Sequence, residues 1–65
     1  MPIIEMKAFE QRFEDPAVVD ELVTRLTEAV ASVFGEDVAR ETWVLLDGRS
    51  PAHWGFGGAV RRDGR

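Results

Sequence analysis

The chain contains no cysteine, and this absence limits the ways in which so small a domain can be stabilised. Disulfides and thiolate metal sites are excluded, and a single histidine argues against a structural zinc site. A chain of 65 residues buries only about 60% of its unfolded surface, so it is marginally stable alone. Oligomerisation is the remaining way to stabilise such a chain. A hydrophobic content of 45%, with two Trp and four Phe, supports it.

Long apolar runs are also missing. No stretch approaches the roughly 20 residues of a membrane span, and no signal peptide is visible, so we expect a soluble cytoplasmic protein without a membrane partner. A net charge of −4 argues against nucleic acid as a partner. The charge is uneven, because four of the eight basic residues follow Gly48. This cationic segment either attracts a small anionic molecule or is a solvated basic tail.

Alternating residues near the start of the chain predict a strand over residues 3–9 with one well-buried face. The apolar residues of that face are Ile4, Met6 and Ala8. Glu5 and Lys7 lie together on the other face, where an ion pair between them is the expected arrangement.

Helical periodicity follows. Asp15 suits an N-cap, Pro16 suits the first helical position, and Gly35 suits a C-cap. Between them, one helical face carries Val19, Leu22, Val23, Leu26, Val30, Val33 and Phe34. The spacing predicts a helix over residues 16–34.

Residues 42–46 are β-branched, aromatic and apolar, which predicts a buried strand after a connector over residues 35–41. Strand, helix and strand in this order predict a right-handed βαβ unit with parallel strands. Residues 47–51 form a turn cluster. Two strands and one helix leave one sheet face and both sheet edges uncovered, so a partner must cover them.

In residues 52–60, aromatic side chains alternate with glycines, which let backbones or ligands approach closely. We interpret this segment as a short hairpin or arm that packs on a neighbouring subunit. Residues 61–65 are expected to fray. There are no internal repeats, so the sequence predicts a single domain over residues 1–65.

Pro2 is the residue whose chemistry points most clearly to catalysis. Removal of Met1 would leave it with a free secondary amine, which is a base and a possible nucleophile. An ordinary terminal amine titrates around 7.7–8.0, and desolvation or a nearby cation lowers that value toward neutrality, where a base works best. The structural alternative is a proline that only begins an edge strand.

Together, Pro2, the βαβ pattern and the run His53-Trp54-Gly55-Phe56-Gly57-Gly58 resemble the 4-oxalocrotonate tautomerase family over nearly the whole chain. The resemblance implies an α/β (α+β) fold, with a β-α-β protomer and a C-terminal hairpin. It implies homodimers that assemble as a trimer of dimers, a hexamer. It also implies a keto–enol tautomerase, with no cofactor and no metal, that acts on a small unsaturated 2-hydroxy or 2-keto acid.

By the same resemblance, Pro2 is the catalytic base and Arg12 binds a substrate carboxylate. The alternative for Arg12 is a salt bridge with Glu10 or Glu14. Trp54 matches the aromatic residue that shapes an apolar pocket wall, a role it can combine with packing between subunits. Phe56 adds low-dielectric surface.

One feature departs from the family pattern. Many members have a second arginine near the start of the second strand, and Trp43 occupies that position here. Arg40 and Arg49 are the candidate substitutes, and His53 is interpreted as a surface residue. The difference makes a mono-acid or a less polar enol at least as plausible a substrate as a dicarboxylate.

Other chemistry at Pro2 stays open, namely hydration or dehalogenation of an unsaturated acid, decarboxylation, or carbon–carbon bond formation through an iminium. A non-catalytic oligomeric scaffold is the alternative if Met1 is retained, because an amide nitrogen is not basic.

Overall fold

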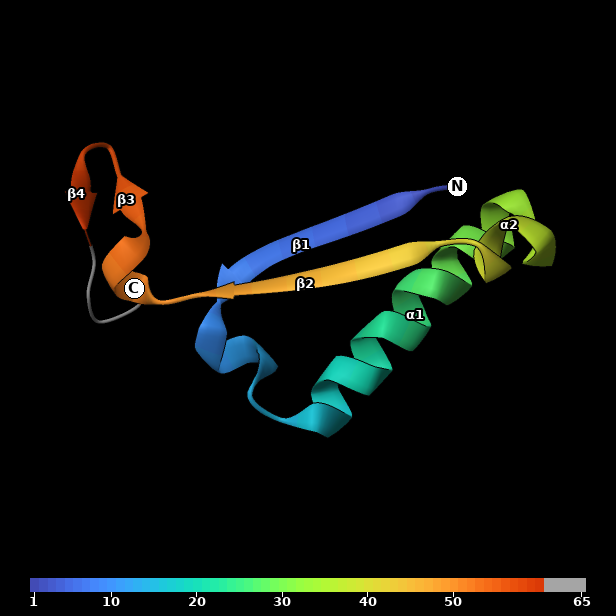
Figure 1. The fold of residues 1–65 in the computed structure, drawn as a ribbon, viewed down its shortest axis with the longest axis horizontal. Coiled ribbons are helices and arrows are strands. Elements are labelled where there is room, and N and C mark those ends of the chain that lie inside the picture. The colour runs from blue at the N-terminus through green and yellow to red at the C-terminus, as the bar shows by residue number, and fades with distance from the viewer. Residues whose placement is uncertain (61–65) are drawn as a thin grey trace.

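The computed structural model describes residues 1–60, and Figure 1 shows its elements in chain order. They are β1 (Ile3–Phe9), the 3-10 helix η1 (Glu10–Phe13), α1 (Pro16–Phe34), α2 (Glu36–Arg40), β2 (Trp43–Arg49), the 3-10 helix η2 (Pro51–His53), β3 (Gly55–Phe56) and β4 (Ala59–Val60). This arrangement confirms the β-α-β protomer with a C-terminal hairpin. The tail expected over residues 61–65 lies outside the described residues.

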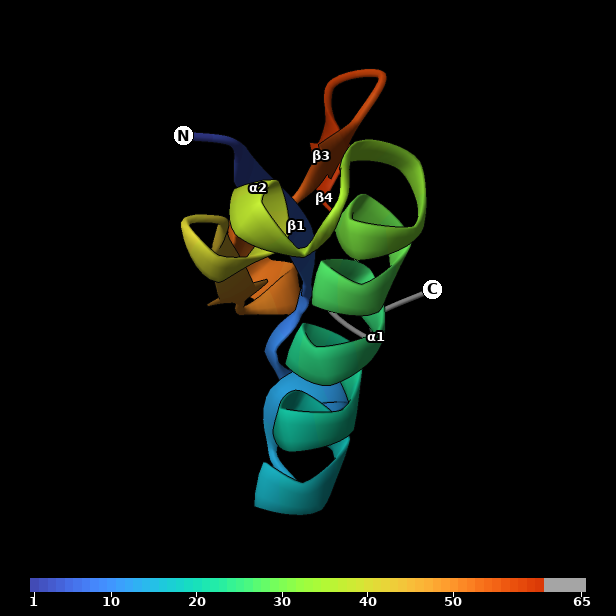
Figure 2. The same ribbon diagram turned by 90° about the vertical axis from the view of Figure 1, so that its right-hand side faces the viewer.

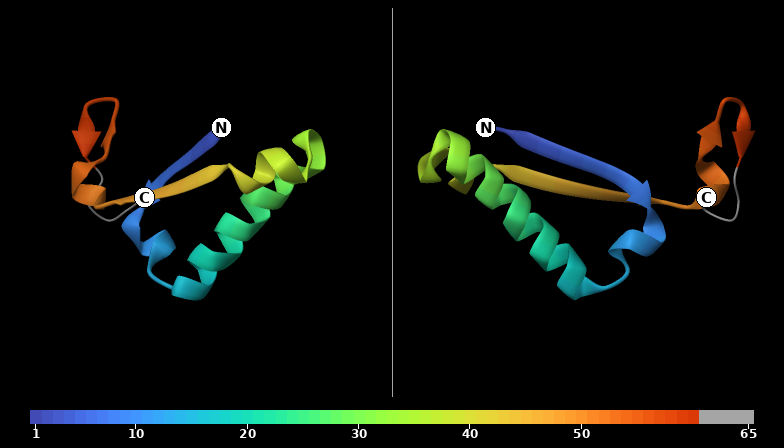
Figure 3. Two further views of the ribbon diagram at one scale, coloured as in Figure 1. Left: turned by 45° about the vertical axis from the view of Figure 1, so that its right-hand side comes forward. Right: turned by 180° about the vertical axis from the view of Figure 1, so that it is seen from behind.

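The central feature is a two-stranded parallel sheet made by β1 and β2. Its register runs from Ile3 opposite Trp43 to Phe9 opposite Arg49. The helix α1 connects the two strands and lies on one side of them (Figures 2 and 3). The predicted parallel pairing is therefore confirmed.

The two faces of this sheet differ in exposure, as the alternating sequence predicts, but the face expected to be well buried is only half-buried in the single protomer. Ile4, Met6 and Ala8 are half-buried, whereas Ile3, Glu5 and Lys7 are exposed. Because side chains alternate between faces along a strand, the second set shares one side of the sheet with Trp43 and Leu45. We call this side the open face.

Helix α1 has the predicted bounds because both of its ends are capped. The Oδ1 atom of Asp15 accepts a hydrogen bond of 2.9 Å from the N–H of Ala17, and Pro16 begins the helix. At the other end, Gly35 has a φ of 96° and donates its N–H to the carbonyl of Ala31 at 2.9 Å. Within residues 1–60, no helix is both long and apolar enough to cross a membrane.

The connector expected over residues 35–41 contains a short helix, α2, which periodicity did not predict. Its five residues complete little more than one turn, so no repeating apolar pattern can develop. Glu36 and Asp37 lie in its first turn, where the helix dipole favours acids. Ala39 is buried against the rest of the protomer, at 6% exposed.

Strand β2 is longer than predicted, and the prediction of a turn directly after residue 46 was wrong. Residues 47–49 have turn-forming chemistry but pair with the last three residues of β1. Gly48 is needed in this position, since a Cβ atom there would lie 3.0 Å from the Cα of Glu10. The close approach of η1 to β2 therefore selects glycine within a strand.

The protomer has almost no core of its own. Among residues 1–60 only Ala39 is buried, while Ile3, Trp43 and Leu45 on the open face are 51%, 55% and 46% exposed. The radius of gyration is 14.6 Å, against about 11 Å for a compact chain of this length. Such exposure is the physical reason to expect a covering partner.

We expect Asp15→Ala to lower the free energy of unfolding by about 1 kcal/mol, because the N-terminal amides of α1 lose their acceptor. Urea denaturation followed by circular dichroism, at one fixed protein concentration, measures this loss. Asp20→Ala is the matched control, since Asp20 is exposed farther along the same helix. Equal losses in the two variants would show that the cap does not stabilise the helix.

Candidate active site

Pro2 lies immediately before β1 and is held there by its backbone. Its carbonyl accepts a hydrogen bond of 3.0 Å from the N–H of Trp43, the first residue of β2. The residue is half-buried. A proline can occupy this place without loss because it has no amide hydrogen to contribute to a strand ladder. The start of the sheet thus holds the carbonyl of Pro2 and keeps the residue at this end of the strands.

Apolar surface lies beside Pro2. The indole of Trp43 and the side chain of Ile3 are register partners on the open face, and both are about half exposed. Arg40 is in α2, at the same end of the sheet (Figure 1), but it forms an ion pair with Asp37. Among the predicted site residues, Pro2, Trp43 and Arg40 therefore form one group, which we call the proline end.

A second group lies at the opposite end of the sheet, around Trp54. The ring of Trp54 is half-buried; its centroid lies 4.4 Å from that of Phe9 and 5.9 Å from that of Phe56. The β3–β4 pair confirms that the predicted segment is a short hairpin, and its turn is made by Gly57 and Gly58, which have φ values of 59° and 91°. These left-handed conformations are the reason for the glycine pair.

Beside Trp54 is a shallow pocket of about 320 Å³ lined by Lys7, Arg49, His53, Trp54 and Gly55. The structure thus brings together two of the candidate site residues, Arg49 and Trp54, and places the exposed His53 beside them. Lys7 was predicted only as an ion-pair partner. A prediction of the strand register would have placed Lys7 near Arg49, because Lys7 pairs with Asp47, two positions before Arg49.

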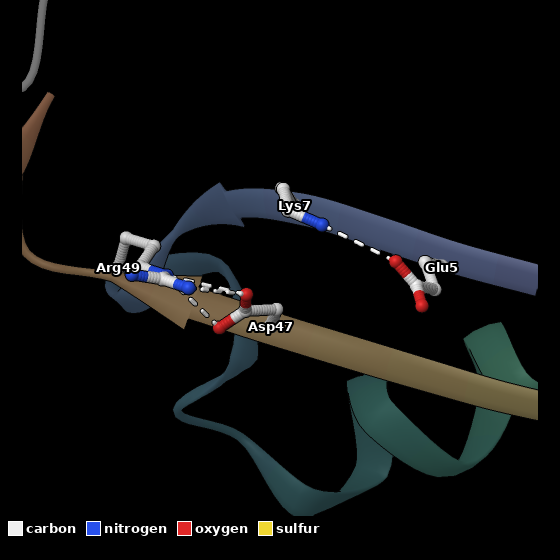
Figure 4. Close-up of polar contacts among 4 residues, drawn as sticks. All are labelled: Glu5, Lys7, Asp47 and Arg49. Carbon is white, nitrogen blue, oxygen red and sulfur yellow. Dashed lines mark hydrogen bonds and ion pairs between the residues drawn. The ribbon is translucent and has the colours of Figure 1, made fainter. Parts of the chain in front are cut away.

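Within residues 1–60, most lysine and arginine side chains are paired with carboxylates. The pairs are Lys7 with Glu5 at 3.3 Å, Arg25 with Glu21 at 2.8 Å, Arg49 with Asp47 at 3.1 Å, and Arg40 with Asp37. Figure 4 shows that the Glu5–Lys7 and Asp47–Arg49 pairs lie side by side on the two strands. The expected pairing of Glu5 with Lys7 is confirmed.

Arg12, in η1, differs from these cations. Within the part of the chain that the structure describes, it is the one Lys or Arg side chain with no ion pair, and the alternative pairing with Glu10 or Glu14 is not formed. An unpaired guanidinium keeps its fork of donors available for a carboxylate. Arg12 is exposed and follows the last residue of β1, at the end of the sheet that carries Trp54.

The predicted site residues therefore do not meet within one protomer. Pro2 precedes β1 and Arg12 follows it, and a seven-residue strand spans about 20 Å. Figure 1 shows the amino terminus and the β3–β4 hairpin at opposite ends of the molecule. We call the group at the hairpin end, with Arg12, Arg49, Trp54 and Phe56, the aromatic end. Across residues 1–60, no group of three His, Asp or Glu side chains could hold a metal ion.

Comparison with known proteins gives one result. A family model described as "Tautomerase enzyme" matches residues 2–64. No curated protein and no solved structure matches the chain significantly. Because the family match covers nearly all of the sequence and agrees with the β-α-β fold, the chain belongs to the tautomerase family, whose superfamily includes 4-oxalocrotonate tautomerase.

Proposed function

We propose that the protein is a cofactor-independent keto–enol tautomerase that uses the amine of Pro2 as its general base. Family membership supports isomerase-type tautomerase activity. The observation that carries the proposal is the place of Pro2, which is half-buried and fixed by the bond from Trp43 to its carbonyl. The substrate class is a small unsaturated 2-hydroxy or 2-keto acid.

The chemistry needs only a proton relay. With Met1 removed, the Pro2 nitrogen takes the proton of the enol O–H, and the electrons of that bond form the carbonyl. The π electrons of the former C=C bond then take a proton from the Pro2 ammonium to make a C–H bond. No proton is gained or lost, and the free amine returns. Terminal amines titrate close enough to neutrality to act in both directions.

Arg12 supplies the electrostatic part of the proposed site. As a guanidinium without a carboxylate partner in residues 1–60, it can bind the substrate carboxylate through two parallel hydrogen bonds. Binding the substrate acid in one orientation presents the enol to the base. Orientation of this kind contributes much of the rate acceleration in enzymes without cofactors.

The separation of the two ends leads us to place each active site between two copies of the chain. The outer edges of the two-stranded sheet of β1 and β2 have no strand partner within residues 1–60, and unpaired edges readily accept another chain. A twofold axis that runs the copies antiparallel would bring the proline end of one to the aromatic end of the other. Family members are typically oligomeric. We propose such a dimer, assembled further into a hexamer as a trimer of dimers.

Pro2→Ala should lower kcat/KM for enol ketonisation by about 100-fold. This is the lower end of what a general base contributes, because the amine of alanine remains in place. Ultraviolet absorbance follows the reaction, on protein whose intact mass confirms the loss of Met1. Pro16→Ala is the control, since Pro16 begins α1 and lies outside both ends of the site.

Undiminished activity of Pro2→Ala in an intact oligomer would overturn the proline base. If the mass shows Met1 retained and no enol is converted, the non-catalytic scaffold becomes the better explanation.

A shared site also predicts complementation. The variants Pro2→Ala and Arg12→Ala should each be nearly inactive alone. When equal amounts are unfolded and refolded together, the mixture should regain about a quarter of wild-type activity. Half of the dimers then contain one copy of each variant, and in those dimers one of the two sites is intact. The same proteins mixed without subunit exchange are the control. A refolded mixture no more active than that control would place both residues in one protomer's site.

A further inference from the structure

The substrate itself can be narrowed from the charges and surfaces of the two ends. We propose that the preferred substrate is a monoanion, with one carboxylate bound by Arg12 and an apolar, aromatic tail lying against the indoles of Trp43 and Trp54. This inference rests on the proposed function, since it concerns the same site. It concerns the part of the substrate that does not react.

The existing ion pairs limit the number of carboxylates that the site can neutralise. Arg40, at the proline end, and Arg49, at the aromatic end, are each paired with an aspartate, and Lys7 is paired with a glutamate. Within residues 1–60 this leaves Arg12 as the one lysine or arginine side chain without an ion pair. A second substrate carboxylate would have to break an existing pair or lose its water without a partner. Displacing the aspartate or glutamate of an exposed pair gains the second carboxylate little, because it only exchanges one exposed ion pair for another, and losing water without a partner is unfavourable for a charged group.

Apolar and aromatic side chains lie next to the base. The N–H of Trp43 is bound to the Pro2 carbonyl, and its side chain is 55% exposed beside the exposed Ile3. At the other end, Trp54 packs on Phe9 and Phe56. Both halves of the proposed site thus present aromatic surface. Aromatic rings stack favourably on such surface, and their burial removes apolar area from water.

Trp43 is the residue that we expect to set this preference. It lies at the proline end, where a cation would favour a second carboxylate and an indole favours an apolar group. It does not transfer a proton, so its replacement should change the choice between substrates more than the chemistry at Pro2.

The test compares phenylenolpyruvate, an aromatic monoanion, with hydroxymuconate, a dianion, in ketonisation. Binding of their non-reacting counterparts, phenylpropanoate and adipate, is measured in parallel by calorimetry. We expect the monoanion to be favoured by about tenfold or more in both kcat/KM and Kd. Trp43→Arg should move both ratios toward the dianion, whereas Trp43→Phe should keep the monoanion preference. Sedimentation confirms that each variant assembles as the wild type does.

A wild-type preference for the dianion in calorimetry overturns the inference, whether or not the protein is active. If the dianion is also converted faster, and both rates collapse in Pro2→Ala, the inference fails while the proposed tautomerase stands. If neither enol is converted but phenylpropanoate still binds more tightly than adipate, the proposed function fails and the monoanion preference is kept. Because the wild-type binding ratio decides the inference, misfolding of Trp43→Arg would not obscure the result.

Discussion

The parallel pairing of β1 with β2 is the interaction on which the rest of this structure depends. Its first hydrogen bond, from the N–H of Trp43 to the carbonyl of Pro2, holds Pro2 at the start of the sheet. Its last pair, Phe9 opposite Arg49, brings the start of the hairpin segment beside the end of β1. Candidate site residues therefore lie at both ends of each strand. They are Pro2 and Arg12 at the ends of β1, and Trp43 and Arg49 at the ends of β2, and the strands keep the two ends apart. A short β-α-β protomer cannot bring both ends together without a second copy.

The same shortness explains the stability problem. One helix covers one face of two strands, and Ala39 is the one buried residue in the described part of the chain. The exposed tryptophan, leucine and isoleucine of the open face are poorly placed for an isolated soluble chain. In an assembly, burial of this surface and completion of the active site would be one event, so the proposed function and the folding of the protomer depend on the same contacts.

Local signals in the sequence predicted most of the fold. Asp15, Pro16 and Gly35 defined α1 because capping is a property of neighbouring residues, and alternation defined β1 for the same reason. The extension of β2 through residues 47–49 depends on pairing with β1, which turn propensity does not contain. The candidate site residues Pro2, Arg12 and Trp54 were named from the chemistry of the proline amine and from the family resemblance, and their roles stay predictions. Only the structure shows which arginines are already paired and that Lys7 shares a pocket with Trp54.

The side-by-side ion pairs Glu5–Lys7 and Asp47–Arg49 have a consequence for how this chain can evolve. On an exposed surface, such pairs contribute little and each residue is free to change. If a second copy covered the open face, as in the proposed assembly, the four charges would lose their water together, and removing one would leave its partner unpaired in a dry interface. The four positions would then have to change in concert. A gene duplicate that altered one of them would be excluded from mixed assemblies, which would keep two diverging copies of the chain separate.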